Sequence, residues 1–92
     1  MSKPFYDVSL SVDQRTGRLM AVYFRVREGE VADTREIVEG KIVADYDEDD
    51  LLLGFELLAP CEVRILDMIT AQESEDVKRF VKRTAPHEMV CA

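Results

Sequence analysis

The chain has 92 residues, of which 47% are hydrophobic and 34% charged, a composition typical of one soluble folded domain. Its formal net charge of −7 argues against binding to nucleic acid or to anionic membrane surfaces, because both depend on clustered lysine and arginine. No apolar run approaches the ~20 residues that cross a bilayer, and the N-terminus lacks the apolar segment of a secretory signal. We therefore expect a single cytoplasmic domain over residues 1–92.

The first strand is predicted from alternation of apolar residues with Asp7, Ser9 and Ser11. It is expected to be half-buried, with one apolar face formed by Tyr6, Val8, Leu10 and Val12. A turn rich in Asp, Thr and Gly follows over residues 13–18. Residues 19–27 predict a second strand, which completes a hairpin. Its expected apolar face consists of Met20, Val22, Phe24 and Val26.

A short strand is expected around residues 34–38, followed by a turn at Glu39–Gly40. The next strand, residues 41–46, places Ile42, Ala44 and Tyr46 on one face. The acidic run 47–50 then leads into the strand 51–58. Its predicted faces are Leu51, Leu53, Phe55 and Leu57 on one side, and Leu52, Gly54, Glu56 and Leu58 on the other. Because both faces carry leucine, this strand is expected at the centre of the sheet or in an interface.

Residues 60–70 are ambiguous, because apolar residues recur there at both strand and helix spacing. We favour an extended start followed by a helical turn near residues 66–69. A helix over residues 74–84 is predicted from Ser74 as its N-cap and from the apolar spacing of Val77, Phe80 and Val81. The sequence thus predicts an α+β fold: an antiparallel β meander of four to five strands within residues 1–59, with one C-terminal helix packed on it.

Four short segments occur in the order and spacing of a known family. They are Val31-Ala32-Asp33-Thr34, Gly40, Ala44-Asp45-Tyr46-Asp47 and Leu53-Gly54-Phe55-Glu56-Leu57-Leu58. This part of the chain, residues 31–58, resembles the domain-of-unknown-function family 2283 of small prokaryotic proteins. Two departures are that Val12-Asp13 replaces the Tyr-Asp start and that Asp50 replaces the turn glycine. The resemblance implies a compact, β-rich, self-associating domain and assigns no catalytic residue.

The acidic run nearly fits a calcium-binding loop. The residues at loop positions one, three, five and twelve are Asp45, Asp47, Asp49 and Glu56, and Asp50 replaces the glycine at position six. The flanking segments are predicted strands, so Glu56 would lie roughly 17–20 Å from the turn and would not close the loop. Two readings stay open: loose binding of a divalent cation or small molecule by Asp47, Asp49 and Asp50, or a plain acidic turn, which we favour.

Three other groups of residues are candidate sites. His87, the only histidine, and Cys91 would form a nucleophile–base pair, but both lie close to the chain end. Glu56 is the best carboxylate for acid–base chemistry, although we favour an exposed residue or a cross-strand partner for Arg or Lys. The basic residues of the helix offer a stripe for an acidic partner, or more simply a solvated face. They are Lys78, Arg79, Lys82 and Arg83.

The two cysteines, Cys61 and Cys91, form neither a CxxC motif nor a zinc-type cluster with His87. A disulfide between them is possible, but we expect two separate reduced thiols in the cytoplasm, with Cys61 packed as a small apolar residue. The four glycines are isolated, so no phosphate-binding loop and no cofactor is predicted. The sequence therefore predicts a non-catalytic interaction or structural module that forms a homodimer.

Overall fold

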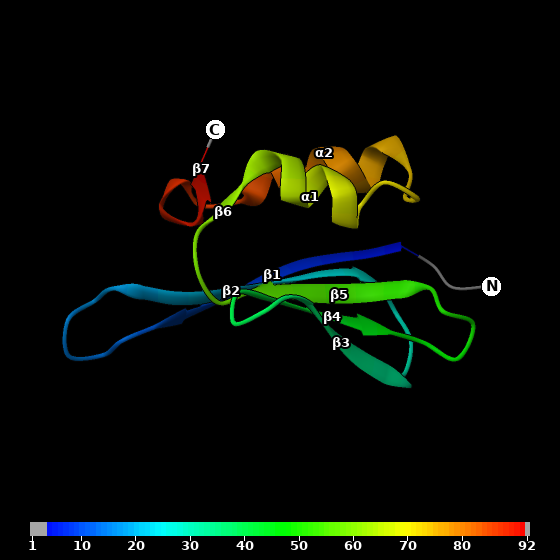
Figure 1. The fold of residues 1–92 in the computed structure, drawn as a ribbon, viewed down its shortest axis with the longest axis horizontal. Helices are drawn as coiled ribbons and strands as arrows, with labels where there is room; N and C mark the ends of the chain where they lie inside the picture. The colour runs from blue at the N-terminus through cyan, green and yellow to red at the C-terminus, as the bar shows by residue number, and fades with distance from the viewer. Residues whose placement is uncertain (1–3, 92) are drawn as a thin grey trace.

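The structure, a computed structural model, describes residues 4–91, apart from the side chains of residues 4 and 91. Five antiparallel strands form one sheet, and two α-helices lie over one of its faces (Figure 1). The strands are β1 (Pro4–Val12), β2 (Leu19–Arg27), β3 (Asp33–Val38), β4 (Ile42–Tyr46) and β5 (Leu52–Leu57). The predicted α+β class and antiparallel sheet are confirmed.

The strand order in the sheet is β1-β2-β5-β4-β3. The last three strands form a meander, and the hairpin of β1 and β2 joins it through antiparallel pairing of β2 with β5. Phe55 of β5 therefore lies between Phe24 of β2 and Ala44 of β4. The prediction that residues 51–58 form a central strand is confirmed, because β5 has two strands on each side.

The hydrophobic core lies between the sheet and the helices. Phe24 and Phe55 stack at its centre, with ring centroids 5.0 Å apart. The sheet contributes Val22, Phe24, Val26, Ile42, Ala44, Leu52, Phe55 and Leu57, and the helices contribute Leu66, Val77 and Val81. These residues bear out the predicted apolar faces of the second and fourth strands, except for Met20, which is 57% exposed.

The described residues contain two α-helices, so the prediction of a single C-terminal helix is wrong. The ambiguous connector forms a two-residue strand, β6 (Cys61–Glu62), and then the helix α1 (Val63–Ile69). The extended start was expected, but the helix begins at Val63, earlier than the predicted turn near residues 66–69. Its helical spacing turns Ile65, Leu66 and Ile69 toward the core. Cys61 is buried, as expected, whereas the thiol of Cys91 lies outside the described side chains.

The second helix, α2 (Glu75–Thr84), closely follows its prediction. Ser74 is the N-cap, and its hydroxyl accepts a hydrogen bond from the backbone N–H of Val77 at 3.4 Å. After Pro86 the chain forms a short 3-10 helix (His87–Met89) and the strand β7 (Val90–Cys91), which pairs with β6 in parallel. None of the helices in the described chain is long and apolar enough to cross a membrane.

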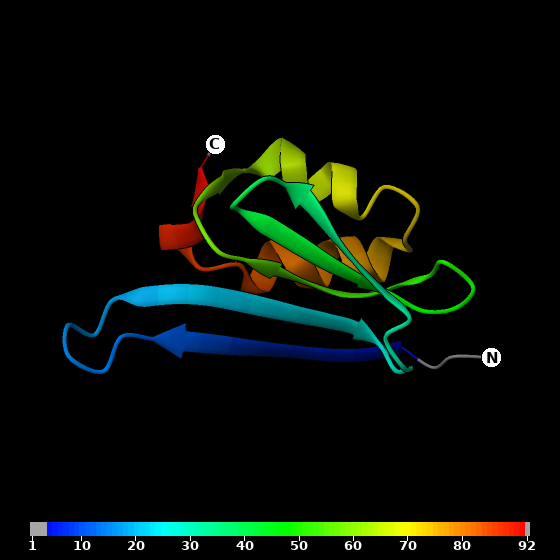
Figure 2. The same ribbon diagram turned by 60° about the horizontal axis from the view of Figure 1, so that its bottom comes forward.

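The prediction that β1 is half-buried is wrong for most of its apolar face. Tyr6, Leu10 and Val12 are 41%, 57% and 53% exposed. The reason is position: β1 is an edge strand, and its hairpin with β2 extends well beyond the helices (Figure 2). This projecting hairpin gives the molecule its elongated dimensions of 42 × 24 × 23 Å.

The predicted faces of β5 are also wrong at Leu52 and Leu53. The pairing register of β4 and β5 shifts between Asp45 and Tyr46, so Leu52 lies opposite Tyr46. Leu52 therefore joins the core beneath the helices, although strict alternation assigns it to the other face. Leu53 is fully buried as well, but it lies outside that core and approaches Gly29.

Candidate functional site

The acidic run forms the predicted turn. One carboxylate oxygen of Asp47 accepts hydrogen bonds from the backbone N–H groups of Asp49, at 2.8 Å, and Leu51, at 2.9 Å. The N–H of Asp50 donates to the carbonyl oxygen of Asp47 at 3.0 Å, and Asp50 has a φ of 65°. Asp50 thus adopts the left-handed conformation that glycine reaches at lower cost.

A salt bridge ties this turn to the edge strand β3. The guanidinium of Arg35 pairs with Asp50 and, at 2.6 Å, with Asp33. It also lies 4.1 Å from the ring centroid of Tyr46. The hydrogen bonds to Asp50 and Asp33 raise the pKa of Arg35 above its ordinary value. The carboxylates of Asp47 and Asp50 therefore have partners within the chain, which compete with any cation.

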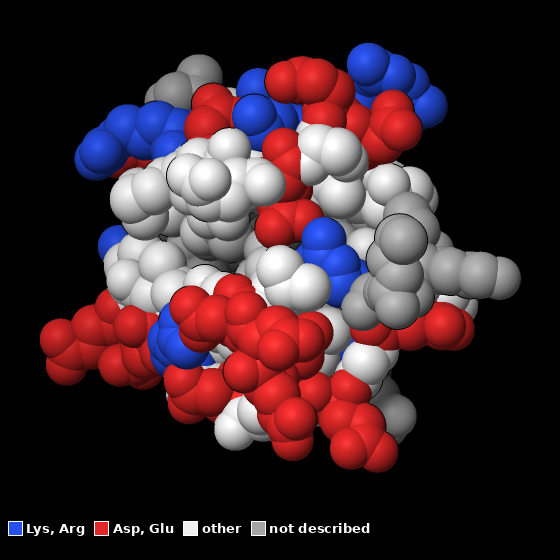
Figure 3. All heavy atoms as spheres, turned by 90° about the vertical axis from the view of Figure 1, so that its right-hand side faces the viewer, with Lys and Arg blue, Asp and Glu red and all other residues white. Residues whose placement is uncertain are grey.

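Acidic side chains gather at this end of the molecule (Figure 3). The turn and the loop between β2 and β3 together line a shallow hollow, to which Glu30, Asp47, Glu48 and Asp49 contribute. Among residues 4–91, no group of three or more His, Cys, Asp or Glu side chains is arranged to hold a metal ion. Loose cation binding at Asp47, Asp49 and Asp50 remains a prediction, and the geometry adds no support to it.

Asp45 takes part in a different arrangement, on the sheet face that the helices leave uncovered. Its carboxylate accepts hydrogen bonds from the Tyr23 hydroxyl at 2.8 Å and the Thr34 hydroxyl at 2.7 Å. The pKa of Tyr23 is raised above the ordinary value of 10.0. The largest cause is burial of the hydroxyl, and the hydrogen bond to Asp45 and the negative charge of Asp45 add to it. Sequence alone did not identify this contact between residues 22 positions apart.

Gly54 lies beneath this contact. It pairs with Arg25 of β2 on one side and Asp45 of β4 on the other. A Cβ atom at Gly54 would lie 2.5 Å from the Tyr23 hydroxyl oxygen and 2.5 Å from the carbonyl oxygen of Phe24. The missing side chain therefore lets Tyr23 extend across the central strand to Asp45. This arrangement links four strands and is structural in character.

The predicted acid–base candidate, Glu56, lies half-buried on the same face. Its neighbours in the sheet are Tyr23 and Val43, not the Arg or Lys that we expected. The nearby Arg25 instead donates to the carbonyl oxygens of Arg27, at 2.8 Å, and Gly29, at 2.7 Å. Among the residues that the structure describes, none forms an ion pair with Glu56.

The suggested pair of His87 and Cys91 is not tested, because the Cys91 side chain lies outside the described part of the chain. His87 itself is exposed in the short 3-10 helix. A nucleophile–base pair requires both side chains within hydrogen-bond reach of each other. Only the backbone of Cys91 is described, in β7, so this pair stays a prediction.

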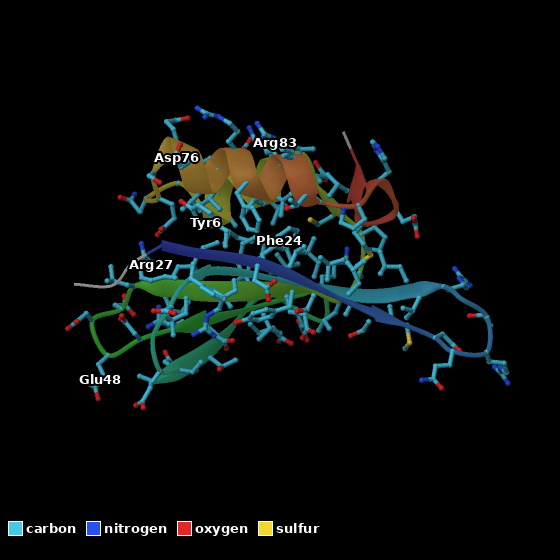
Figure 4. The ribbon with its side chains drawn as sticks, turned by 180° about the vertical axis from the view of Figure 1, so that it is seen from behind. Tyr6, Phe24, Arg27, Glu48, Asp76 and Arg83 are labelled. Carbon is cyan, nitrogen blue, oxygen red and sulfur yellow. The ribbon has the colours of Figure 1, made fainter. Side chains whose placement is uncertain are left out.

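Acidic neighbours pair with most of the basic stripe of α2. Lys82 forms a salt bridge with Asp67 of α1 at 2.9 Å. The other pairs are Glu75 with Lys78 at 3.6 Å and Asp76 with Arg79 at 3.7 Å. Asp76 and Arg83 lie towards opposite ends of the helix (Figure 4). This mixture of charges fits the solvated face that we favoured over a docking site for an acidic partner.

The most distinctive uncovered surface lies on the hairpin of β1 and β2, and the sequence pattern did not reveal it. At the end of β1 that projects beyond the helices, the apolar side chains of Leu10 and Val12 are 57% and 53% exposed. Period-two alternation identifies residues that share a face, but it does not show whether another element covers that face. The position of β1 at the sheet edge supplies the missing information.

Residues 21–59 match the model of the family described as "Protein of unknown function (DUF2283)". This match confirms the resemblance predicted for the middle of the chain. The matched segment runs from β2 to just beyond β5, so β1 and both helices lie outside it. No curated protein and no solved structure matches the chain.

Proposed function

We propose that this chain is a non-catalytic structural or interaction module that associates with a second copy of itself. The observation that carries the proposal is the exposed apolar surface of the projecting hairpin. Leu10 and Val12 of β1 are each more than half exposed there. Exposed apolar side chains that are neighbours on one face of a strand favour an interaction site, and a domain of this size gains stability from a second subunit.

A non-catalytic role is supported by the partners of the candidate residues. Asp45 holds Tyr23 and Thr34, and Asp47 holds the backbone of its own turn. These carboxylates link strands and stabilise a turn through hydrogen bonds, whereas catalytic groups face a cavity that admits a substrate. The proposal also places the protein in the cytoplasm, where a chain with two cysteines in 92 residues needs no disulfide framework.

Size-exclusion chromatography with light scattering, run from low micromolar to near-millimolar concentration, tests the proposal. The expected result is a species of twice the chain mass that dissociates on dilution. Association through apolar surface should persist at high salt, whereas association through the acidic end and basic helix would weaken. A monomer over the whole concentration range would refute self-association.

A further inference from the structure

The two edges of the sheet differ in how they are protected from pairing. The outer edge strand β3 has six residues, three of them charged. Register shifts occur in the pairing of both edge strands with their neighbours, so they do not distinguish the two edges. Charged side chains discourage a second chain from adding to an edge. In contrast, β1 has nine residues, and Asp7 is its only charged one. The edge formed by β1 is therefore the one suited to pairing.

We infer that β1 is the strand through which two copies associate, pairing antiparallel with β1 of the second copy. The two five-stranded sheets then form one continuous sheet of ten strands, with the helices of both copies on the same face. This inference rests on the proposed self-association and names its surface and its partner. The unpaired backbone N–H and C=O groups along the edge gain hydrogen bonds that water otherwise provides.

The pattern of β1 is self-complementary in this arrangement. Val8 lies opposite Phe24 of β2, on the helix side of the sheet, whereas Ser9 lies opposite Tyr23 on the other side. Residues directly opposite each other in an antiparallel pair point to the same side of the sheet. One residue of β1 must therefore lie opposite its own copy, with the twofold axis midway between the two. An axis at Ser9 places Val8 opposite Leu10 of the second copy. It also places Asp7 opposite Ser11 of the second copy, so that the two carboxylates do not meet.

The same register covers the exposed end of β1. Tyr6 stacks on Phe80 of α2, with ring centroids 5.1 Å apart, so this end of the strand lies beneath a helix (Figure 4). The other end, with Leu10 and Val12, lies beyond the helices. With the axis at Ser9, Val12 lies opposite Tyr6 of the second copy. The uncovered end of each strand thereby lies beside the covered end of the other.

Two matched variants test this surface: Leu10→Lys on β1 and Met20→Lys on β2. Both residues are 57% exposed in the same hairpin, so each change adds one charge and removes similar apolar area. Sedimentation equilibrium then gives the dimer dissociation constant. We expect Leu10→Lys to raise it by about tenfold or more, because the lysine disrupts strand pairing. Met20→Lys should change it by less than about threefold.

Isotope-filtered NOE spectra of a mixture of labelled and unlabelled wild-type chains provide a second test that needs no variant. The expected result is contacts between the Val8 and Leu10 methyl groups of different copies. If Met20→Lys weakens the dimer as much as Leu10→Lys, or if the dimer forms without these contacts, association uses another surface. The inference then fails while the proposed function stands. A wild-type chain that stays monomeric removes both.

Discussion

Replacing Gly54 with alanine tests how tightly the central strand is constrained. The added methyl group would lie 2.5 Å from the Tyr23 hydroxyl oxygen and 2.5 Å from the Phe24 carbonyl oxygen. The tyrosine side chain can rotate away, but the carbonyl oxygen belongs to the strand that pairs with β5. Both the contact of Tyr23 with Asp45 and the pairing of β2 with β5 should therefore be disturbed.

The expected cost follows from three contributions. Overpacking a filled site costs about 1–3 kcal/mol. Loss of a hydrogen bond to a charged acceptor, here between Tyr23 and Asp45, costs about 1.5–3 kcal/mol when it is complete. Alanine offsets about 0.4–1 kcal/mol by restricting the unfolded chain. With partial loss of the hydrogen bond, Gly54→Ala should lower the free energy of unfolding by about 3 kcal/mol.

Urea unfolding followed by circular dichroism measures this change, at one fixed chain concentration because self-association would also contribute to stability. The corresponding fall in melting temperature is at least about 10 °C for a domain of this size. In a Tyr23→Ala background only the carbonyl contact remains, so the cost of Gly54→Ala should fall by about 1 kcal/mol. A Gly54→Ala protein as stable as the wild type would contradict the steric reasoning.

Two further predictions concern the carboxylates that the sequence first suggested as calcium ligands. The raised pKa of Tyr23 stabilises the fold fully below the ordinary tyrosine value of 10.0, and this stabilisation is lost as pH rises towards the folded-state value. Unfolding free energies measured below and above pH 10 should therefore fall less steeply for Tyr23→Phe than for wild type, and equal slopes would count against the contact with Asp45. Asp47→Ala should cost about 1–2 kcal/mol in urea unfolding because two backbone N–H groups lose their acceptor. Asp49→Ala serves as its control and should change stability by less than about 0.5 kcal/mol; equal costs would refute the role given to Asp47.

The parts of the fold that the sequence predicted are those determined by local physics. Val22 and Phe24 alternate with polar residues in a strand that has neighbours on both sides, so period two correctly identified their buried face. Ser74 begins α2 because its hydroxyl satisfies a free N–H of the first turn. The turn at residues 47–50 forms because aspartate side chains accept hydrogen bonds from the backbone that follows them.

The parts that the sequence did not predict depend on contacts between distant residues. Pairing of β2 with β5 joins segments about thirty residues apart, and together with the pairing of β4 with β5 it brings Tyr23 across Gly54 to Asp45. The face of Leu52 follows from a register shift, which alternation cannot represent. In the same way, the exposure of β1 depends on how far the helices extend over the sheet, and not on the sequence of β1 itself.

The strands inside and outside the family match differ in where they place the edge of the sheet. Residues 21–59 supply most of β2 and all of β3, β4 and β5. In a sheet of these four strands alone, β2 would be an edge strand and both faces of the sheet would be uncovered. In this chain α1 and α2 cover one of those faces, and β1 pairs with the open edge of β2. β1 moves this edge outward without removing it, and as the new edge strand it carries one charged residue, whereas β3 at the other edge carries three. An edge strand rich in exposed Leu and Val is an aggregation hazard unless it has a defined partner. A closed twofold pairing of β1 removes that hazard, because once the two copies are joined each remaining outer edge is the charged strand β3.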